Sequence, residues 1–241
     1  MDFSQIGSVQ ELFKAGGVVL ILLLCLSIYS ISLMIERFFK YRRTINKSRK
    51  LMSFLRKTLA TEGLSPKLFD ACRVKGYSTT PAAKITLNLL KSNKTTLAEL
   101  NDLADTIIDW EAAQLSRKLS ALATLASTTP FIGLFGTVLG VMRAFADLSL
   151  ASGTGASAVA KGISEALINT AAGLFVAVPA LIAYNYFLSK VNFFTKDLEY
   201  LAQELISAKI ELSKKPAVQP AMQPAPQPQK ENEPEFFEVI R

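Results

Sequence analysis

Residues 16–35 read GGVVLILLLCLSIYSISLMI, and no side chain in this run is charged. About 20 apolar residues are enough to cross a bilayer as a helix. A secretory signal peptide would carry its positive charges before such a run, whereas here the charges follow it. The basic residues that follow are Arg37, Lys40, Arg42, Arg43, Lys47, Arg49 and Lys50. The pattern therefore predicts a membrane-spanning helix over residues 16–39.

The same charges predict how this helix is oriented. Before the apolar run, only Asp2, Glu11 and Lys14 are charged. Segments rich in Lys and Arg next to a span stay on the cytoplasmic side of the membrane. We therefore expect residues 1–15 to be an N-terminal periplasmic segment and the basic segment to be cytoplasmic.

The composition as a whole also fits a membrane protein. Half of the 241 residues are hydrophobic and the mean hydropathy is +0.28, which is too apolar for an ordinary soluble domain. The net charge of +7 comes from Lys and Arg beside apolar runs. No basic groove with interleaved aromatics is evident, so we expect the lipid bilayer, and no nucleic acid, as a partner.

Residue types that carry most enzyme chemistry are scarce. Histidine is absent, which removes the commonest general base and the commonest metal ligand. The two cysteines, Cys25 and Cys72, fall in an apolar run and in a polar segment, so we expect them not to pair. No nucleotide-binding glycine loop is present. We therefore expect no enzyme activity, no cofactor and no metal site.

Two further apolar runs predict two more spanning helices. Residues 119–146 are rich in small side chains, and Gly136 and Gly140 have the GxxxG spacing that lets helices approach closely. Residues 159–189 form the third predicted span. Residues 147–158 between them contain no Lys or Arg, so we expect a short periplasmic loop.

The remaining residues are expected on the cytoplasmic side. Residues 40–118 and 190–215 carry apolar residues at helical spacing, and the second of these segments is expected to continue the third span. Residues 216–241 are rich in Pro and Gln and are expected to be a disordered tail with a cytoplasmic C-terminus. The predicted fold class is an all-α polytopic membrane protein with three transmembrane helices and long cytoplasmic helical extensions.

Glu165 is the candidate functional residue that stands out most. A charged side chain at the centre of a membrane helix costs about 2.5 to 3.5 kcal/mol, so an acid within a span favours a function. The bland alternative is that Glu165 lies near the interface, or pairs with Lys161 one turn earlier.

Other polar residues in the spans are candidates for a hydrated path or for hydrogen bonds between helices. They are Thr137, Asn169 and Thr170, although a threonine often bonds only to its own helix backbone. Asn169 lies near the face of Glu165, whereas Thr170 is rotated by about 140° from it, so one straight polar stripe does not hold both. Candidates for pore lining or helix contact are Asn169, Gly133, Gly136, Gly140, Pro130 and Pro179, and the two prolines are either hinges or tolerated kinks.

Two strings resemble known signatures. Residues 127–142, STTPFIGLFGTVLGVM, resemble the second-helix signature of the ExbB/TolQ proton-channel family. Residues 162–175, GISEALINTAAGLF, together with Val178-Pro179-Ala180 and Tyr184-Asn185, resemble its third-helix signature. The resemblance covers roughly residues 15–212 and includes the three-helix topology. The related flagellar stator proteins have four spans and fit less well.

The resemblance implies a pentamer in the cell inner membrane around a pair of single-span helices of an ExbD- or TolR-like partner, whose aspartate carries protons. Proton flow would then energise a TonB- or TolA-like protein that reaches across the periplasm. By the matching motifs, Thr137, Glu165 and Thr170 are expected near the proton path. The ExbB role is slightly favoured over the TolQ role.

Two features depart from the family pattern. Arg143 stands where a neutral polar residue is expected, and the Pro/Gln-rich tail is an addition. A non-conducting membrane scaffold is the main alternative function, although a pure scaffold has no need of Glu165. A small-molecule transporter would usually show inverted repeats and broken helices, and neither is visible.

Overall fold

The computed structural model of the chain describes residues 9–150 and 155–214. These residues form helices and no strand. The helices are α1 (Val9–Glu62), α2 (Pro66–Arg73), α3 (Pro81–Lys91), α4 (Leu97–Ser116), α5 (Leu119–Leu150) and α6 (Gly155–Lys214). The expected tail and most of the expected N-terminal segment lie outside the described residues.

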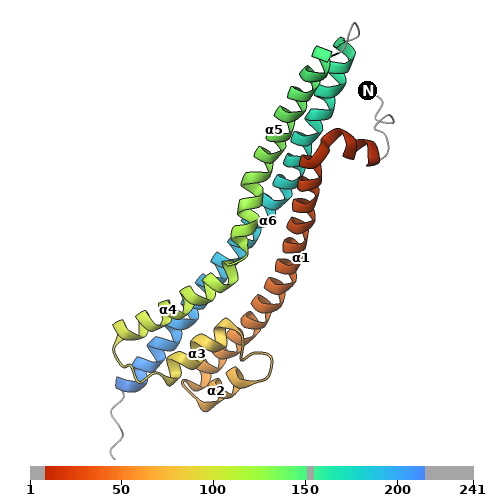
Figure 1. The fold of residues 1–241 in the computed structure, drawn as a ribbon. Helices are drawn as coiled ribbons and strands as arrows, with labels where there is room; N and C mark the ends of the chain where they lie inside the picture. Colours follow the sequence, from red (N-terminus) through yellow and green to blue (C-terminus); the bar gives the residue numbers. More distant parts are fainter. Residues whose placement is uncertain (1–8, 151–154, 215–241) are drawn as a thin grey trace, which may run out of the picture.

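Three long helices lie side by side and give the molecule the shape of a rod (Figure 1). Helices α5 and α6 form an antiparallel hairpin, and α1 packs beside α6. Helices α2, α3 and α4 gather at one end, here called the polar end, and α4 leads into α5 across residues 117 and 118. The opposite end, where α5 meets α6, is here called the hairpin end.

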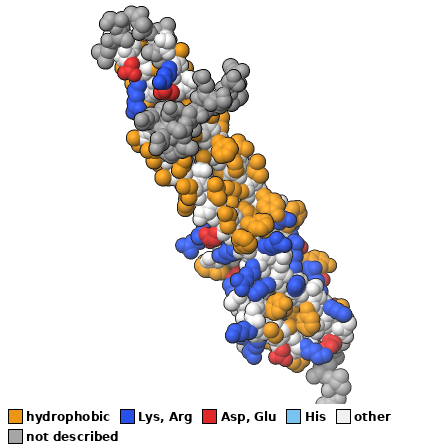
Figure 2. Space-filling view, turned by 90° about the vertical axis from the view of Figure 1, so that its right-hand side faces the viewer, with side chains coloured by type: hydrophobic (Ala, Val, Ile, Leu, Met, Phe, Trp, Pro, Cys, Tyr) orange, Lys and Arg blue, Asp and Glu red, His pale blue; other side chains and the backbone are white. Residues whose placement is uncertain are grey.

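Among the described residues, α1, α5 and α6 each contain a stretch that is long and apolar enough to cross a membrane. Their apolar side chains face outward rather than inward: Val18, Phe131 and Phe175 are 78%, 71% and 77% exposed. Such a surface is unfavourable in water but is suited to lipid tails. Figure 2 shows hydrophobic side chains as a broad band on the face that it presents, with Lys and Arg gathered beside this band toward the polar end. The predicted all-α fold with three spanning helices is confirmed.

The helices extend further than the sequence pattern suggested. Helix α5 reaches Leu150 and α6 begins at Gly155, so both ends of the expected 147–158 loop are helical. Helix α6 runs without a break through residues 190–214, as expected for a continuous third span. Helix α1 bends at Gly17, whose φ of 60° separates Val9–Gly16 from the spanning part.

The polar end has a conventional core. Buried apolar side chains from α1 to α6 meet there, among them Leu55, Leu68, Ile85, Leu100 and Phe194. Residue Thr80 begins α3 by accepting a hydrogen bond from the Ala83 amide, and Pro81 occupies the first turn, where its missing N–H costs nothing. The polar end therefore has the packing of a small soluble domain.

Lys209 of α6 holds the end of α3. Its Nζ donates hydrogen bonds to the carbonyl oxygens of Leu89 and Ser92, both at 2.7 Å, and to Ser92 Oγ at 2.9 Å. These carbonyls lie at a helix C-terminus, where they have no intrahelical donors and where a cation is favoured. Burial lowers the pKa of the Lys209 ammonium, and the three acceptors offset that cost. The contact ties the polar end to the last turns of α6.

Lys209→Met should destabilise the polar end by about 1–3 kcal/mol, because it removes the ammonium donor from the Ser92 carbonyl and leaves the Leu89 carbonyl with only the Ser92 hydroxyl. The measurement is thermal unfolding of the full chain in detergent. Lys57→Met is the matched control, because Lys57 is exposed and no hydrogen bond or ion pair of its ammonium is seen in the described structure. Equal unfolding temperatures for the two variants would show that the cap contributes nothing.

Candidate functional site

The contact between α5 and α6 is built from glycines. A Cβ added at Gly133 would lie 2.6 Å from the Asn169 carbonyl oxygen, and one at Gly140 would lie 2.5 Å from Ala166 Cβ. A Cβ at Gly173 would lie 2.7 Å from the Thr129 carbonyl oxygen. Real side chains do not tolerate such distances, so only glycine lets the two helices approach this closely.

At Gly136 of α5, helices α1 and α6 both come into close contact with α5. A Cβ there would lie 2.7 Å from Asn169 Cβ on α6 and 2.8 Å from a methyl group of Val19 on α1. Gly162 and Ala144 repeat the same kind of contact nearer the hairpin end. We call the whole contact between Thr129–Ala144 and Gly162–Gly173 the glycine seam.

The glycine seam buries two polar side chains on α6. Asn169 is 3% exposed, and its Oδ1 has no hydrogen-bond partner in the described structure. The Oγ1 of Thr170 is likewise buried without a partner. Buried polar atoms without a hydrogen-bond partner are uncommon in folded proteins. Two of the predicted site residues are therefore adjacent and hydrogen-bond deficient.

Glu165 has a different environment. Its side chain is 38% exposed, and its carboxylate lies 3.9 Å from the ammonium of Lys161 on the same helix. The pair is long and Lys161 is highly exposed, so its contribution to stability is small. Glu165 thus has the ion pair that the bland alternative described, although its role in proton transfer remains a prediction.

The other predicted residues are arranged as follows. The hydroxyl of Thr137 donates to the Leu134 carbonyl at 2.6 Å, so its proton is bound within α5. Pro130 and Pro179 lie inside α5 and α6, and neither proline ends its helix. Arg143 lies beside the bend in α1: its Nη1 is 3.4 Å from the place where a Cβ on Gly17 would be.

The levels of these residues can be compared along the rod. Asn169 and Val19 lie together, and Glu165 is one helical turn, or about 6 Å, closer to the hairpin end. That puts Glu165 near the level of Gly17, where the uncharged stretch of α1 begins. At the other end of this stretch, Lys118 donates to both carboxylate oxygens of Glu36 at 2.8 and 2.7 Å.

The distance from Gly17 to Glu36 is about 28 Å by the helical rise, close to the ~30 Å of a bilayer's hydrocarbon core. By the same rise, Glu165 lies about 3 Å beyond the Gly17 edge of the apolar stretch, whereas Asn169 and Thr170 lie about 3 to 5 Å inside it. The geometry favours Asn169 and Thr170 as the polar groups that a hydrated path would meet within the membrane.

Arg37 has a special environment that was not predicted from the sequence. Arg37 is only 2% exposed, and of its donors only Nη2 has an acceptor, Glu36 Oε1 at 3.3 Å. Its spacing in the sequence could have indicated burial. Leu33, Arg37, Tyr41 and Ile45 are four residues apart and share one buried face of α1. The tyrosine of this series donates its hydroxyl to the Leu115 carbonyl at 2.7 Å.

Gly136→Leu should disrupt the glycine seam, because the new side chain overlaps Asn169 and Val19. Overpacking typically costs about 1–3 kcal/mol, so the full chain should unfold at lower temperature in detergent and be cut faster by protease. Val138→Leu adds bulk two residues away, on the outward face of α5, and should behave like the unmodified chain. A Gly136→Leu protein as stable as this control would show that the seam is loosely packed.

Comparison with known proteins gives one consistent result. The model of the MotA/TolQ/ExbB proton channel family matches residues 77–200. The biopolymer transport protein ExbB of Neisseria meningitidis serogroup A is 33% identical over 204 residues, which cover 80% of this chain and 93% of that relative.

Two other relatives extend the comparison. A putative biopolymer transport protein, ExbB-like 3 of Synechocystis, is 34% identical over 179 residues, covering 73% of this chain and 82% of its own length. The Tol-Pal system protein TolQ of Haemophilus influenzae is 51% identical over 87 residues, covering 36% of this chain and 38% of its own. With three membrane-spanning helices and matches of this extent, the chain belongs to the MotA/TolQ/ExbB proton channel family.

Proposed function

We propose that this chain is a proton-channel and stator subunit of the cell inner membrane. With a single-span partner of the ExbD/TolR type, it uses the proton-motive force to energise a TonB-like protein that reaches across the periplasm. The observation that carries the proposal is the buried pair of Asn169 and Thr170, whose side-chain oxygens lack partners inside an apolar stretch. An unsatisfied buried oxygen costs about 1–3 kcal/mol, so a donor from water or from a partner side chain would be favoured wherever the packing around the pair opens to admit one.

The three spans require a partner to complete a proton path. No Asp, Glu, Lys or Arg occurs in residues 18–35, 119–142 or 166–189. These segments therefore contain no charged side chain that would relay a proton across ~30 Å of hydrocarbon. A carboxyl group on a neighbouring transmembrane helix supplies the proton carrier in this proposal, while Thr137, Glu165 and Thr170 tune the path.

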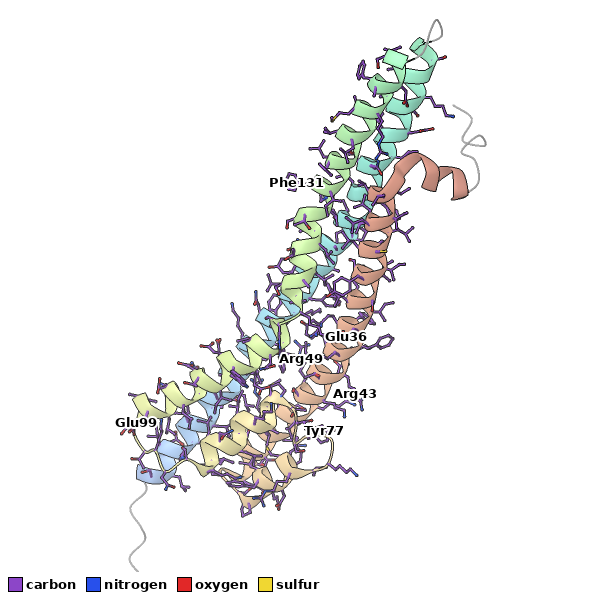
Figure 3. The ribbon with its side chains drawn as sticks, viewed as in Figure 1. Glu36, Arg43, Arg49, Tyr77, Glu99 and Phe131 are labelled. Carbon is purple, nitrogen blue, oxygen red and sulfur yellow. The ribbon has the colours of Figure 1, made fainter. Side chains whose placement is uncertain are left out.

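Assembly into a homo-oligomer is part of the same proposal. Large apolar side chains remain exposed on α5, including Phe131, Leu134 and Phe135, at 71%, 54% and 59%. Figure 3 shows Phe131 directed away from α6. This face of α5 is available to other copies of the chain and to the single-span partner, and a pentamer is the arrangement that the family resemblance implies.

The comparisons favour an ExbB role over a TolQ role. The ExbB relative aligns over nearly its whole length, whereas the TolQ relative aligns over little more than a third. The higher identity to TolQ within that shorter segment keeps a Tol-Pal-type motor as the second candidate. In a strain lacking the chain, loss of nutrient uptake across the outer membrane supports the first role, and loss of envelope integrity supports the second.

The proposed orientation has the N-terminus and the hairpin end in the periplasm and the polar end in the cytoplasm. In a Cys25→Ser background, cysteines at Ser4 and Ser152 should react with an impermeant thiol reagent added to intact spheroplasts. A cysteine at Ser53, an exposed position of α1, should react only after permeabilisation.

The native Cys72 should add little background in this experiment. It is buried, and desolvation raises the pKa of its thiol to about 11, so the reactive thiolate is scarce at neutral pH. Labelling of Ser53→Cys but not of Ser4→Cys in intact spheroplasts would reverse the proposed orientation.

The role of Glu165 is tested by two substitutions. Glu165→Gln keeps the shape and the hydrogen-bonding capacity but removes titration, and Glu165→Ala also removes the contact. In cells with matched protein levels, the Gln variant should retain part of the proton-gradient-dependent activity and the Ala variant should lose nearly all of it.

Lys161→Gln is the matched control, because it breaks the 3.9 Å ion pair while leaving the acid in place. It should remain active if the carboxyl group itself matters. Full activity of the Glu165→Ala variant would remove Glu165 from the mechanism.

A further inference from the structure

Helices α1 and α6 pair their charges in a regular register at the polar end. Arg49 Nη2 lies 3.1 Å from Asp197 Oδ2, and Arg56 Nε lies 2.9 Å from Glu204 Oε2. Each arginine is 148 positions before its acid, and the two pairs are one heptad apart. Helices packed side by side repeat their contacts at this interval.

The next pair in this register, one heptad closer to the apolar spans, is Arg42 and Lys190. Both residues are cationic. The register that pairs an arginine with an acid at the two following positions therefore places two positive charges together here. Tyr41 and Phe187, whose rings are 5.3 Å apart, confirm that the two helices are in contact at this level.

A cavity of about 280 Å³ lies between the helices at this place. Arg42 and Lys190 both line it, and its lining contains no Asp or Glu. A third cation, Arg49, also lines the cavity, but its charge is paired with Asp197. The remaining lining residues are aromatic, apolar or uncharged polar: Phe38, Tyr41, Ile45, Asn46, Tyr186 and Phe187.

Acids in the neighbourhood are already paired. Asp197 and Glu204 bind Arg49 and Arg56, and Glu36 binds Lys118. Within the described structure, neither Arg42 nor Lys190 makes an ion pair, and the Lys190 ammonium lies 5.4 Å from the centroid of the Tyr186 ring. The cavity therefore has an uncompensated double positive charge.

The cavity also lies at the boundary of the apolar band. Phe38 and Tyr186 are in the last turns of the predicted spans, and Arg42 and Lys190 follow about one turn later. Figure 2 shows Lys and Arg gathered directly beside the hydrophobic band on the α1 side of the molecule. Lipid headgroups lie at this depth, and aromatic side chains are favoured there.

We propose that this cavity between α1 and α6 is a binding site for an anionic phospholipid of the leaflet at the polar end. The phosphate lies between Arg42 and Lys190 and supplies the negative charge that acids supply at the two following pairs. The acyl chains extend along the exposed apolar side chains above it, Phe38 on α1 and Ile182 on α6. The site does not depend on the proposed proton-channel function.

A soluble anion would neutralise the two cations but would leave the adjoining apolar surface without a partner. The aromatic lining and the adjoining apolar surface suit a molecule with both a phosphate and hydrocarbon chains. A zwitterionic lipid brings a choline cation to a place that already holds two cations, so an anionic lipid is favoured.

The test uses the full chain, purified in detergent and stripped of lipid, with binding measured by native mass spectrometry. The probes are dioleoyl phosphatidylglycerol and dioleoyl phosphatidylcholine, which share their acyl chains. Each cation near a lipid phosphate favours the anionic lipid by about fivefold, so with two cations the unmodified chain should prefer it by about 25-fold.

The double variant Arg42→Gln/Lys190→Gln should lose this preference. The matched control is Arg43→Gln/Lys50→Gln, which removes the same charge from α1 positions that are exposed and do not line the cavity. Figure 3 shows Arg43 on the side of α1 away from Arg49 and α6. The control should keep its preference to within about twofold.

Lys190→Glu is a second, independent variant. It gives Arg42 an acid in the same register as Asp197 and Glu204, so all three arginines are then paired with an acid of α6. The variant should lose the preference for phosphatidylglycerol, and without lipid it should unfold at the same temperature as the unmodified chain or higher. This result would separate loss of binding from loss of folding.

Two outcomes would overturn the proposal. One is an equal preference for phosphatidylglycerol in the unmodified chain, the Arg42→Gln/Lys190→Gln variant and the Lys190→Glu variant. The other is displacement of the lipid by millimolar inorganic phosphate, because competition at that level would identify the site as one for soluble anions.

Discussion

The approach of α5 to α6 leaves no space for a side chain at Gly133, Gly136, Gly140 or Gly173, and the rest of the membrane part depends on that closeness. In a bilayer, apolar surface gains little by leaving lipid, so helices associate through tight packing of small residues. The glycines supply that packing. They also bring the backbone and side chain of Asn169 into contact with α5. This contact buries Asn169, although most of the surrounding helix surface is exposed.

The two ends of the molecule are stabilised by different means. Within the apolar stretch the contacts are steric, and Val19 of α1 reaches the seam only because Gly136 has no side chain. At the polar end, water is available to hydrate unpaired groups, and ion pairs, a lysine cap and a buried apolar core take over. The change occurs where Glu36 meets Lys118, at the boundary of the uncharged stretch of α1.

Much of this organisation could be predicted from the sequence because hydropathy and charge asymmetry are local signals. The three spans, the close-packing glycines and the continuation of α6 all follow from residues near one another in the chain. The environment of Glu165 was harder to predict, because the depth of a residue depends on which level of α1 lies beside it. Arg37 was read as one of several basic residues after a span, and only the packing of α1 shows that it is buried. Likewise, no local pattern places Arg42 opposite Lys190, since that pairing depends on a register between segments 148 positions apart.

Helix α6 extends over 60 residues without interruption, a length of about 90 Å. Its first part carries Asn169 and Thr170, and its last turns hold α3 through Lys209. In a rigid helix of this length, a small rotation at one point corresponds to a larger displacement at the far end. A tilt of about 5° pivoting at Pro179 would carry the far end of α6 sideways by roughly 5 Å, about the rise of one helical turn. Because the Lys209 ammonium caps α3, such a tilt would move the end of α3 together with the last turns of α6.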